Sequence, residues 1–127
     1  MDILIENDRL KSTAKKISNM SDIDKYDIYM GLDHTGEAVA SAISFAKGKP
    51  CITKELVERS DNALEHDLNL LMIFLAKEIG TDELISLIKI YRIKGFQIGR
   101  IISLGAPETE TENELKMLGV KVMQVDY

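Results

Sequence analysis

The chain contains 127 residues, 45% of them hydrophobic and 29% charged, which is the size and composition of a single folded domain. The lone Cys51 excludes an intramolecular disulfide framework and a cysteine-rich zinc site. No apolar run reaches the roughly 18 residues of a membrane span, and the acidic start is unlike a signal peptide, so we expect a cytoplasmic protein with no membrane partner. Sixteen basic against 21 acidic residues give a net charge of −5, which argues against a general nucleic-acid surface but leaves a local basic patch open.

Apolar periodicity and turn residues divide the chain into alternating strands and helices. A short apolar run over 2–6 predicts a first strand, and helical spacing follows it from Leu10 to Ile17. The elements expected next are a strand over 26–32, a helix over 37–47, an ambiguous segment over 51–59, helices over 61–79 and 81–93, a strand over 98–104, a helix over 110–118 and a strand over 119–125. The order β-α-β-α-α-α-β-α-β predicts a single α/β domain over residues 1–127, with a small central sheet covered by helices.

The segment LNLLMIFLA, from Leu68 to Ala76, is more apolar than a surface helix should be. An amphipathic helix shows one apolar stripe, whereas a helix that is apolar all round is buried or contacts a partner. Two interpretations stay open for this segment and the helix after it. They form either a thick hydrophobic core or a subunit interface, and the second leaves a homo-oligomer open.

The turn after the second strand carries the residues nearest to a catalytic or ligand-binding motif, namely Gly31, Asp33, His34, Thr35 and Gly36. Ligands of open α/β sheets lie beyond the carboxyl ends of the strands, so His34 could act as a general base oriented by Asp33. Alternatively, Asp33 caps the next helix and His34 lies in its first turn. The same loop could cradle a phosphate with backbone N–H groups, although it is neither a P-loop nor a dinucleotide fingerprint.

The sequence indicates neither a metal site nor a reactive thiol. His66 stands between Glu65 and Asp67, but successive residues on a helix point about 100° apart, and no second His or Cys joins them. Cys51 has no activating partner nearby in the sequence and is expected to be a buried small side chain. We therefore expect no metal and no cofactor.

Two stretches carry a first family resemblance. These are YDIYMGLDHTGEAVASAISFAKGKP and GRIISLGAPETETENELKMLGVKVMQV. They resemble the strand, pyrophosphate loop and Ala-rich helix, and a later strand-loop-helix-strand unit, of the type I phosphoribosyltransferases. That family carries two adjacent acidic residues at the end of the later strand, followed by a Thr- and Gly-rich phosphate loop. Ser103-Leu104 and Pro107-Glu108-Thr109-Glu110 stand there instead. The resemblance thus implies this fold without the usual phosphoribosyl-pyrophosphate loop, binding a nucleotide or phosphosugar.

A second pattern covers more of the chain. It consists of a Gly and acid-His turn before Ala at a four-residue interval, a Gly-Lys step, a Thr-basic pair, and two apolar helices. The residues that match it are Gly31, Asp33, His34, Ala38, Ala42, Gly48, Lys49, Thr53, Lys54, Leu56, Leu84, Leu87 and Ile88. In these residues the chain resembles the small kinase-binding subunit of the KEOPS tRNA-modification complex, the PRPK-binding protein family.

The second resemblance implies a non-catalytic accessory subunit in threonylcarbamoyl-adenosine modification of tRNA. Its expected partners are an atypical protein kinase and tRNA. The kinase would meet the helix face formed by Leu84, Leu87, Ile88 and Tyr91. The tRNA would meet the basic residues Lys54, Arg59, Lys89, Arg92 and Lys94, which are otherwise an ordinary solvated surface.

We prefer the kinase-binding interpretation from sequence, with the phosphoribosyltransferase-like protein as the alternative. A small enzyme that uses Asp33 and His34, such as a sugar-phosphate isomerase, ranks third. The first two differ in structure. A transferase fold places five strands in a parallel sheet with residues 31–36 facing residues 105–111, and an adaptor has no need of that pocket.

Overall fold

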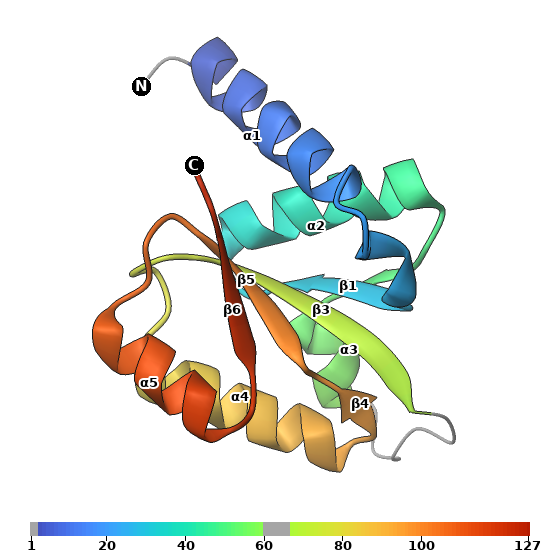
Figure 1. Ribbon diagram of the computed structural model, residues 1–127. Coiled ribbons are helices and arrows are strands. Elements are labelled where there is room, and N and C mark those ends of the chain that lie inside the picture. Colours follow the sequence, from blue (N-terminus) through green and yellow to red (C-terminus); the bar gives the residue numbers. More distant parts are fainter. Residues whose placement is uncertain (1–2, 60–66) are drawn as a thin grey trace.

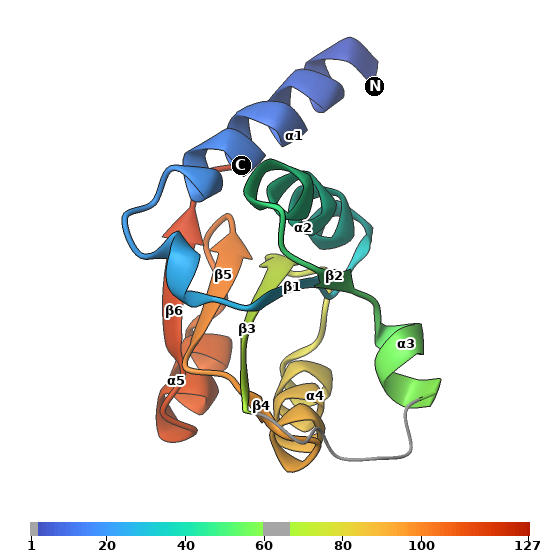
Figure 2. The same cartoon turned by 90° about the vertical axis from the view of Figure 1, so that its right-hand side faces the viewer.

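The computed structural model describes residues 3–59 and 67–127, which form a parallel sheet between two layers of helices (Figures 1 and 2). The α/β class expected from the sequence is confirmed. The elements in chain order are α1 (Ile3–Ser18), the 3₁₀ turn η1 (Ile23–Lys25), β1 (Ile28–Gly31), α2 (His34–Lys47), β2 (Cys51–Ile52), α3 (Lys54–Arg59), β3 (Leu68–Leu75), α4 (Thr81–Ile93), β4 (Phe96–Gln97), β5 (Arg100–Leu104), α5 (Thr109–Met117) and β6 (Lys121–Val125).

All strand pairs in the sheet are parallel, and the strands lie in the order β2-β1-β3-β5-β6, with β4 paired to the start of β3. The chain moves from β1 to β2 in one direction and then returns past β1 to β3, β5 and β6. The strand order therefore reverses at β1, which makes the carboxyl ends of β1 and β3 a topological switch point, where ligands of such sheets bind. Five parallel strands on one path are what the sequence analysis expected of a transferase fold.

The central strand β3 occupies a segment that the sequence analysis assigned to a helix over 61–79. Its residues alternate between two cores: Leu70, Met72 and Phe74 pack toward α4, while Leu71 and Ile73 pack toward α2, and all are at most 2% exposed. A parallel strand buried on both faces shows an unbroken apolar run instead of alternation, and Leu and Met are good helix formers. This burial favours the core interpretation of the segment. Residues 60–66 lie outside the described part of the chain.

The N-terminal segment also differs from expectation, because residues from Ile3 onward continue the helix predicted from Leu10. The apolar run that suggested a strand is exposed, with Ile3 79% and Leu4 74% accessible, and this end of α1 projects past the rest of the domain (Figure 1). Farther along, Ala14 and Ile17 pack in the same core as α2. The ambiguous segment over 51–59 resolves into β2 and α3.

One extra residue interrupts the pairing along one side of β3. Asn69 pairs with Gln97 of β4, and Met72 pairs with Ile101 of β5. Two residues of β3 thus lie opposite the three residues 98–100, the arrangement of a β-bulge. Because side chains alternate along a strand, the extra residue brings Gln97 and Arg100 to the same face of the sheet.

Candidate functional site

The start of α2 is closed by the carboxylate of Asp33, which uses both of its oxygens inside the chain. Oδ1 accepts from the backbone N–H of Gly36 at 2.6 Å, and Oδ2 accepts from the backbone N–H of Leu75 at 2.6 Å. The first bond caps the helix, and the second ties the end of β1 to the end of β3, 42 residues away. The Asp33 side chain therefore connects α2, β1 and β3 at the topological switch point.

The two glycines of this loop are required by close backbone packing. A Cβ atom on Gly31 would lie 2.0 Å from the backbone nitrogen of Glu37, and one on Gly36 would lie 2.3 Å from the carbonyl oxygen of Ile73. The first turn of α2 thus rests directly against β3, which leaves no space there for a phosphate.

These contacts make residues 31–36 a structural connection between α2 and β3, and not the general base or the phosphate loop considered in the sequence. The Asp33 carboxylate binds backbone N–H groups, and no hydrogen bond or ion pair with His34 is found among the described residues. His34 is exposed at the first helical position, as the capping alternative expected. The N–H of Gly36, which a phosphate would need, is already occupied by Asp33.

A pocket of about 90 Å³ lies instead where α4 and α5 begin, at the carboxyl edge of the sheet, the edge at which the parallel strands end. Its lining comes from the connection between β3 and α4 and from the connection between β5 and α5. The lining residues are Phe74, Lys77, Ile79, Gly80, Thr81, Pro107, Glu108 and Thr111. The hydroxyls of Thr81 and Thr111 join the two helix starts by a hydrogen bond of 2.7 Å.

Neither helix start at this pocket has a side-chain cap. The N-cap residues are Gly80 for α4 and Glu108 for α5, and neither provides a capping hydrogen bond. The first N–H groups of a helix have no partner within the helix and carry its positive dipole end. Two such ends therefore converge at the pocket, in contrast to the start of α2, which Asp33 closes.

The charged groups at the pocket are one cation and one anion, Lys77 and Glu108. Lys77 has φ of 73° and is the only non-glycine residue at positive φ in the described part of the chain. A side chain in this region costs roughly 1–2 kcal/mol, and such strain tends to accumulate at functional sites. Sequence reasoning missed these residues because β3 was taken for a helix; the Gly80-Thr81 step at a strand-to-helix junction was the available signal.

No adjacent acidic pair follows the described strands that end near this pocket. β1 is followed by Leu32-Asp33, β3 by Ala76-Lys77, and β5 by Gly105-Ala106. The substitution noted in the sequence at Ser103-Leu104 therefore has no replacement on the neighbouring strands. Ser103 itself is fully buried, and its hydroxyl donates to the carbonyl of Gly105 at 2.8 Å.

The helix face expected to meet a kinase lies mostly inside the domain. Leu84 and Ile88 are fully buried and Tyr91 is 1% exposed in the core below the sheet, while Leu87 is half-buried. Leu84, Ile88 and Tyr91 belong to the core that includes Leu70, Met72 and Phe74 of β3. The Tyr91 hydroxyl has no partner among the described residues, and burial raises the pKa of Tyr91 to about 12.

The basic residues expected to meet tRNA are largely engaged within the chain. Arg92 donates to the carbonyls of Leu118 at 2.8 Å and Ile98 at 2.7 Å, which clips α4 to two neighbouring segments. The other contacts are those of Lys94 with the Val57 carbonyl at 3.3 Å, Lys54 with Glu83 at 3.4 Å and Arg59 with Glu55 at 3.9 Å. Lys89 is exposed on α4.

The thiol and the potential metal ligands considered in the sequence form no site in the described part of the chain. Burial raises the pKa of the Cys51 thiol, which disfavours the thiolate. Residues 3–59 and 67–127 contain no group of three His, Cys, Asp or Glu side chains placed to hold a metal, and His66 lies outside this range. Among the same residues, no helix is long and apolar enough to cross a bilayer.

Comparison with known proteins identifies the fold. No protein-family model matches the chain, and no curated protein matches its sequence. Leishmania donovani UMP synthase matches with a TM-score of 0.69 and 18% identity, over 92% of this chain and 26% of that chain. Aeropyrum pernix orotate phosphoribosyltransferase matches with a TM-score of 0.66 and 14% identity, over 94% of this chain and 70% of that chain. The fold is phosphoribosyltransferase-like.

These matches support the first resemblance noted in the sequence, which covers the strand and loop after residue 26 and the C-terminal unit from Gly99. The resemblance to the kinase-binding subunit gains no support from them. The chain spans about a quarter of the length of the UMP synthase, so the comparison concerns one domain of that protein.

Proposed function

We propose that this chain is a phosphoribosyltransferase-fold protein that binds a phosphorylated small molecule, a nucleotide or a phosphosugar, without transferring a phosphoribosyl group. The observation that carries the proposal is the convergence of the uncapped starts of α4 and α5 on one pocket at the carboxyl edge. Fold likeness to an orotate phosphoribosyltransferase and to a UMP synthase agrees with it.

The chemistry of the pocket suits a phosphate group in a protein that is otherwise acidic. Backbone N–H groups at a helix start bind phosphate without a side-chain cation, and two helices double the number of donors. The hydroxyls of Thr81 and Thr111 and the ammonium of Lys77 add further donors. The carboxylate of Glu108 opposes an anion, so we expect modest affinity.

The missing acidic pair supports the non-catalytic part of the proposal. The family that the sequence resembles carries two adjacent acidic residues at the end of the strand before its phosphate loop. Ser103-Leu104 stands at that place at the end of β5, and Ala76-Lys77 follows the neighbouring strand β3, so neither strand end supplies the pair.

Titration with ribose 5-phosphate, using ribose as the uncharged control, tests binding. We expect ribose 5-phosphate alone to shift the backbone amide resonances of Gly80, Thr81 and Thr111. Thr81→Val should weaken this binding, whereas the matched substitution Thr109→Val, at an exposed residue beside the pocket, should not. Equal shifts with ribose, or no shift at these amides, would contradict the proposal.

Catalysis is tested separately with phosphoribosyl pyrophosphate and a mixture of nucleobases. Release of pyrophosphate that depends on the protein would overturn the non-catalytic part and leave the binding part intact. Association with an atypical kinase and tRNA stays a prediction. A pull-down from native lysate that recovers such subunits in stoichiometric amount would favour it, and recovery of the chain alone would favour the ligand-binding proposal.

A further inference from the structure

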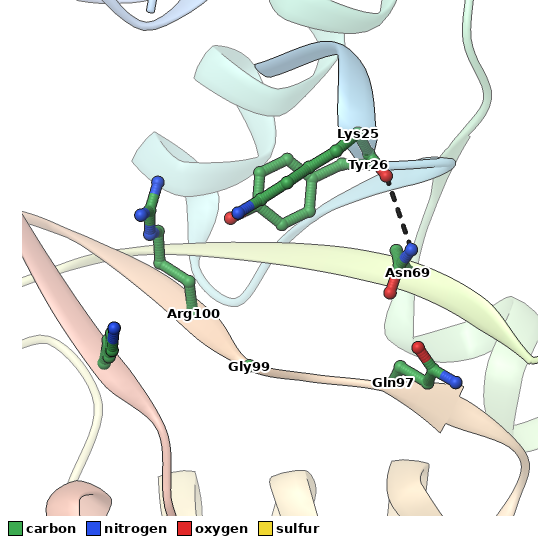
Figure 3. A pocket seen from close by; sticks show the side chains of 7 residues that line it. Lys25, Tyr26, Asn69, Gln97, Gly99 and Arg100 are labelled. Atoms are coloured by element: carbon green, nitrogen blue, oxygen red, sulfur yellow. Dashed lines mark hydrogen bonds between the residues drawn. The ribbon is translucent and has the colours of Figure 1, made fainter. Parts of the chain in front are cut away.

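A second and larger cavity lies at the amino edge of the sheet, where the parallel strands begin (Figure 3). It has a volume of about 320 Å³ and is lined by Lys25, Tyr26, Asn69, Gln97, Gly99, Arg100 and Lys121. Ligand pockets occupy roughly 300–1,000 Å³, so this cavity has room for a nucleotide-sized ligand, whereas the carboxyl-edge pocket of about 90 Å³ has room for the phosphate group of its ligand. Its position at the opposite edge makes it separate from the site proposed above.

The register of the sheet explains why these residues share one side. Asn69 of β3 pairs with Gln97 of β4, and Arg100 of β5 pairs with Lys121 of β6. Residues paired in register point to the same face, and the extra residue among 98–100 brings the two pairs to a common face. A Cβ atom on Gly99 would meet nothing within 4 Å, so the space between the pairs is open.

The cavity concentrates positive charge in a chain whose net charge is −5. Arg100 and Lys25 share one carboxylate, that of Asp22, which lies 3.6 Å from the Lys25 ammonium and binds the Arg100 guanidinium. Lys121 is exposed and has no acidic group within 4 Å in the described part of the chain. A second carboxylate, that of Asp27, accepts from the Asn69 backbone N–H at 2.8 Å. Three cations against these two anions still leave a local excess of positive charge, which attracts anions from solution.

Polar and aromatic groups complete the other end of the cavity. Figure 3 shows the Arg100 guanidinium on one side of the Tyr26 ring and the side chains of Asn69 and Gln97 on the other. The Asn69 amide is held by a 3.4 Å hydrogen bond to the Lys25 carbonyl, and the Lys25 ammonium lies 5.5 Å from the Tyr26 ring centre. Carboxamides present a donor and an acceptor side by side, a pattern that matches the edge of a planar base.

We propose that this amino-edge cavity binds a nucleotide-sized phosphate monoester, independently of the carboxyl-edge site. Arg100, Lys121 and Lys25 take the phosphate, and Asn69 and Gln97 take the planar hydrogen-bonding group. Asp22 competes with the phosphate for Arg100: its hydrogen bond to Arg100 lowers the pKa of Asp22, so the carboxylate stays charged beside the guanidinium.

Amide resonances distinguish the two edges. We titrate the intact chain with AMP, adenosine and inorganic phosphate and follow Gly99 at the amino edge and Gly80 at the carboxyl edge. AMP should shift Gly99 at lower concentration than phosphate does, and adenosine should shift it least. Shifts at Gly80 alone would overturn this inference and leave the proposed function standing, while shifts at Gly99 alone would do the reverse.

Charge variants test whether the cations bind the ligand. Lys121→Gln should weaken AMP binding at Gly99 by about fivefold to tenfold, the loss expected when one charge-assisted contact is removed. Lys11→Gln, the same change at an exposed residue of α1 outside the cavity, should have no effect. Asp22→Asn removes the competing negative charge while keeping size, so AMP should bind more tightly. If Lys121→Gln leaves AMP affinity unchanged, or if Asp22→Asn and Lys121→Gln weaken it equally, the inference fails.

Discussion

Replacing Asp33 by Ala should destabilise the fold more than the loss of an ordinary helix cap. The carboxylate accepts two backbone hydrogen bonds of 2.6 Å, one from α2 and one from the end of β3. A helix N-cap alone contributes about 0.5–2 kcal/mol. A hydrogen bond to a charged group contributes about 1.5–3 kcal/mol, and we take the lower end for each because Asp33 is only partly buried. The expected loss in the free energy of unfolding is therefore about 3 kcal/mol.

Urea unfolding followed by circular dichroism measures this loss directly. A change of about 3 kcal/mol corresponds to a fall in Tm of roughly 10 °C for a domain of this size. Asp33→Asn is the matched control, since it keeps the shape and one acceptor oxygen, and it should lose about half as much. Hydrogen exchange at the amides of Gly36 and Leu75 should accelerate together in the Ala variant.

A loss below about 1 kcal/mol for Asp33→Ala would refute the argument, because it would equal a weak cap alone. The same holds if Asp33→Asn matches the wild type, since an amide cannot accept at both positions. If hydrogen exchange accelerates at Gly36 but not at Leu75, the whole loss of stability comes from the helix cap, and the hydrogen bond to Leu75 contributes nothing.

Three further predictions concern packing and buried polar groups. Gly36→Ala should lower the free energy of unfolding by at least about 2 kcal/mol or prevent folding, because its Cβ would overlap the backbone of β3. Gly80→Ala, whose Cβ meets open space, should lower it by less than about 1 kcal/mol in the same unfolding assay, because Ala is only a poorer N-cap than Gly. Tyr91→Phe should be neutral or stabilising by about 1 kcal/mol because the buried hydroxyl lacks a partner. The Tyr91 pKa is about 12 in the native state and about 10 when unfolded, so wild-type stability should fall as pH rises from 10 toward 12, and the variant should lose less. Arg92→Gln should lower the free energy of unfolding by about 2 kcal/mol, because Arg92 donates to two backbone carbonyls. Lys89→Gln, at an exposed residue of the same helix, should leave it almost unchanged. Equal effects of the two substitutions would contradict a stabilising role for the Arg92 hydrogen bonds.

Amphipathic elements with clear ends were predictable from the sequence, and the doubly buried or projecting ones were not. The helix over 81–93 was predicted with its observed bounds, because Thr81 and Gly95 mark its limits and its apolar residues recur at helical spacing. The prediction for β3 was wrong because a strand buried on both faces lacks the alternation of apolar and polar residues that identifies a strand. The prediction for the first turn of α1 was wrong because its apolar residues are exposed, so their pattern carries no information about a core.

In the candidate sites, contacts between sequence neighbours were predictable, whereas contacts that depend on the arrangement of the strands were not. Asp33 as a helix cap could be derived from local spacing, since a cap and its N–H lie three residues apart. The bond from Asp33 to Leu75 could not, because it depends on how β1 and β3 lie in the sheet. The pocket between α4 and α5 required β3 to be recognised as a strand. The amino-edge cavity depends on strand register, which a single sequence does not reveal.

The extra residue opposite β3 makes the amino-edge cavity sensitive to insertions and deletions in a way that substitutions cannot reproduce. Removing Gly99 would pair Ile98 and Arg100 with the two residues of β3 between Asn69 and Met72, in a regular strand. Gln97 and Arg100 would stay on one face as alternate residues, but the open space that Gly99 leaves between them would close. A relative that kept the charged and amide side chains but lacked one position here would therefore lack the open centre of the cavity. In any future alignment, the length of this short connection would identify the proteins that share the cavity better than the identities of its lysines and arginines.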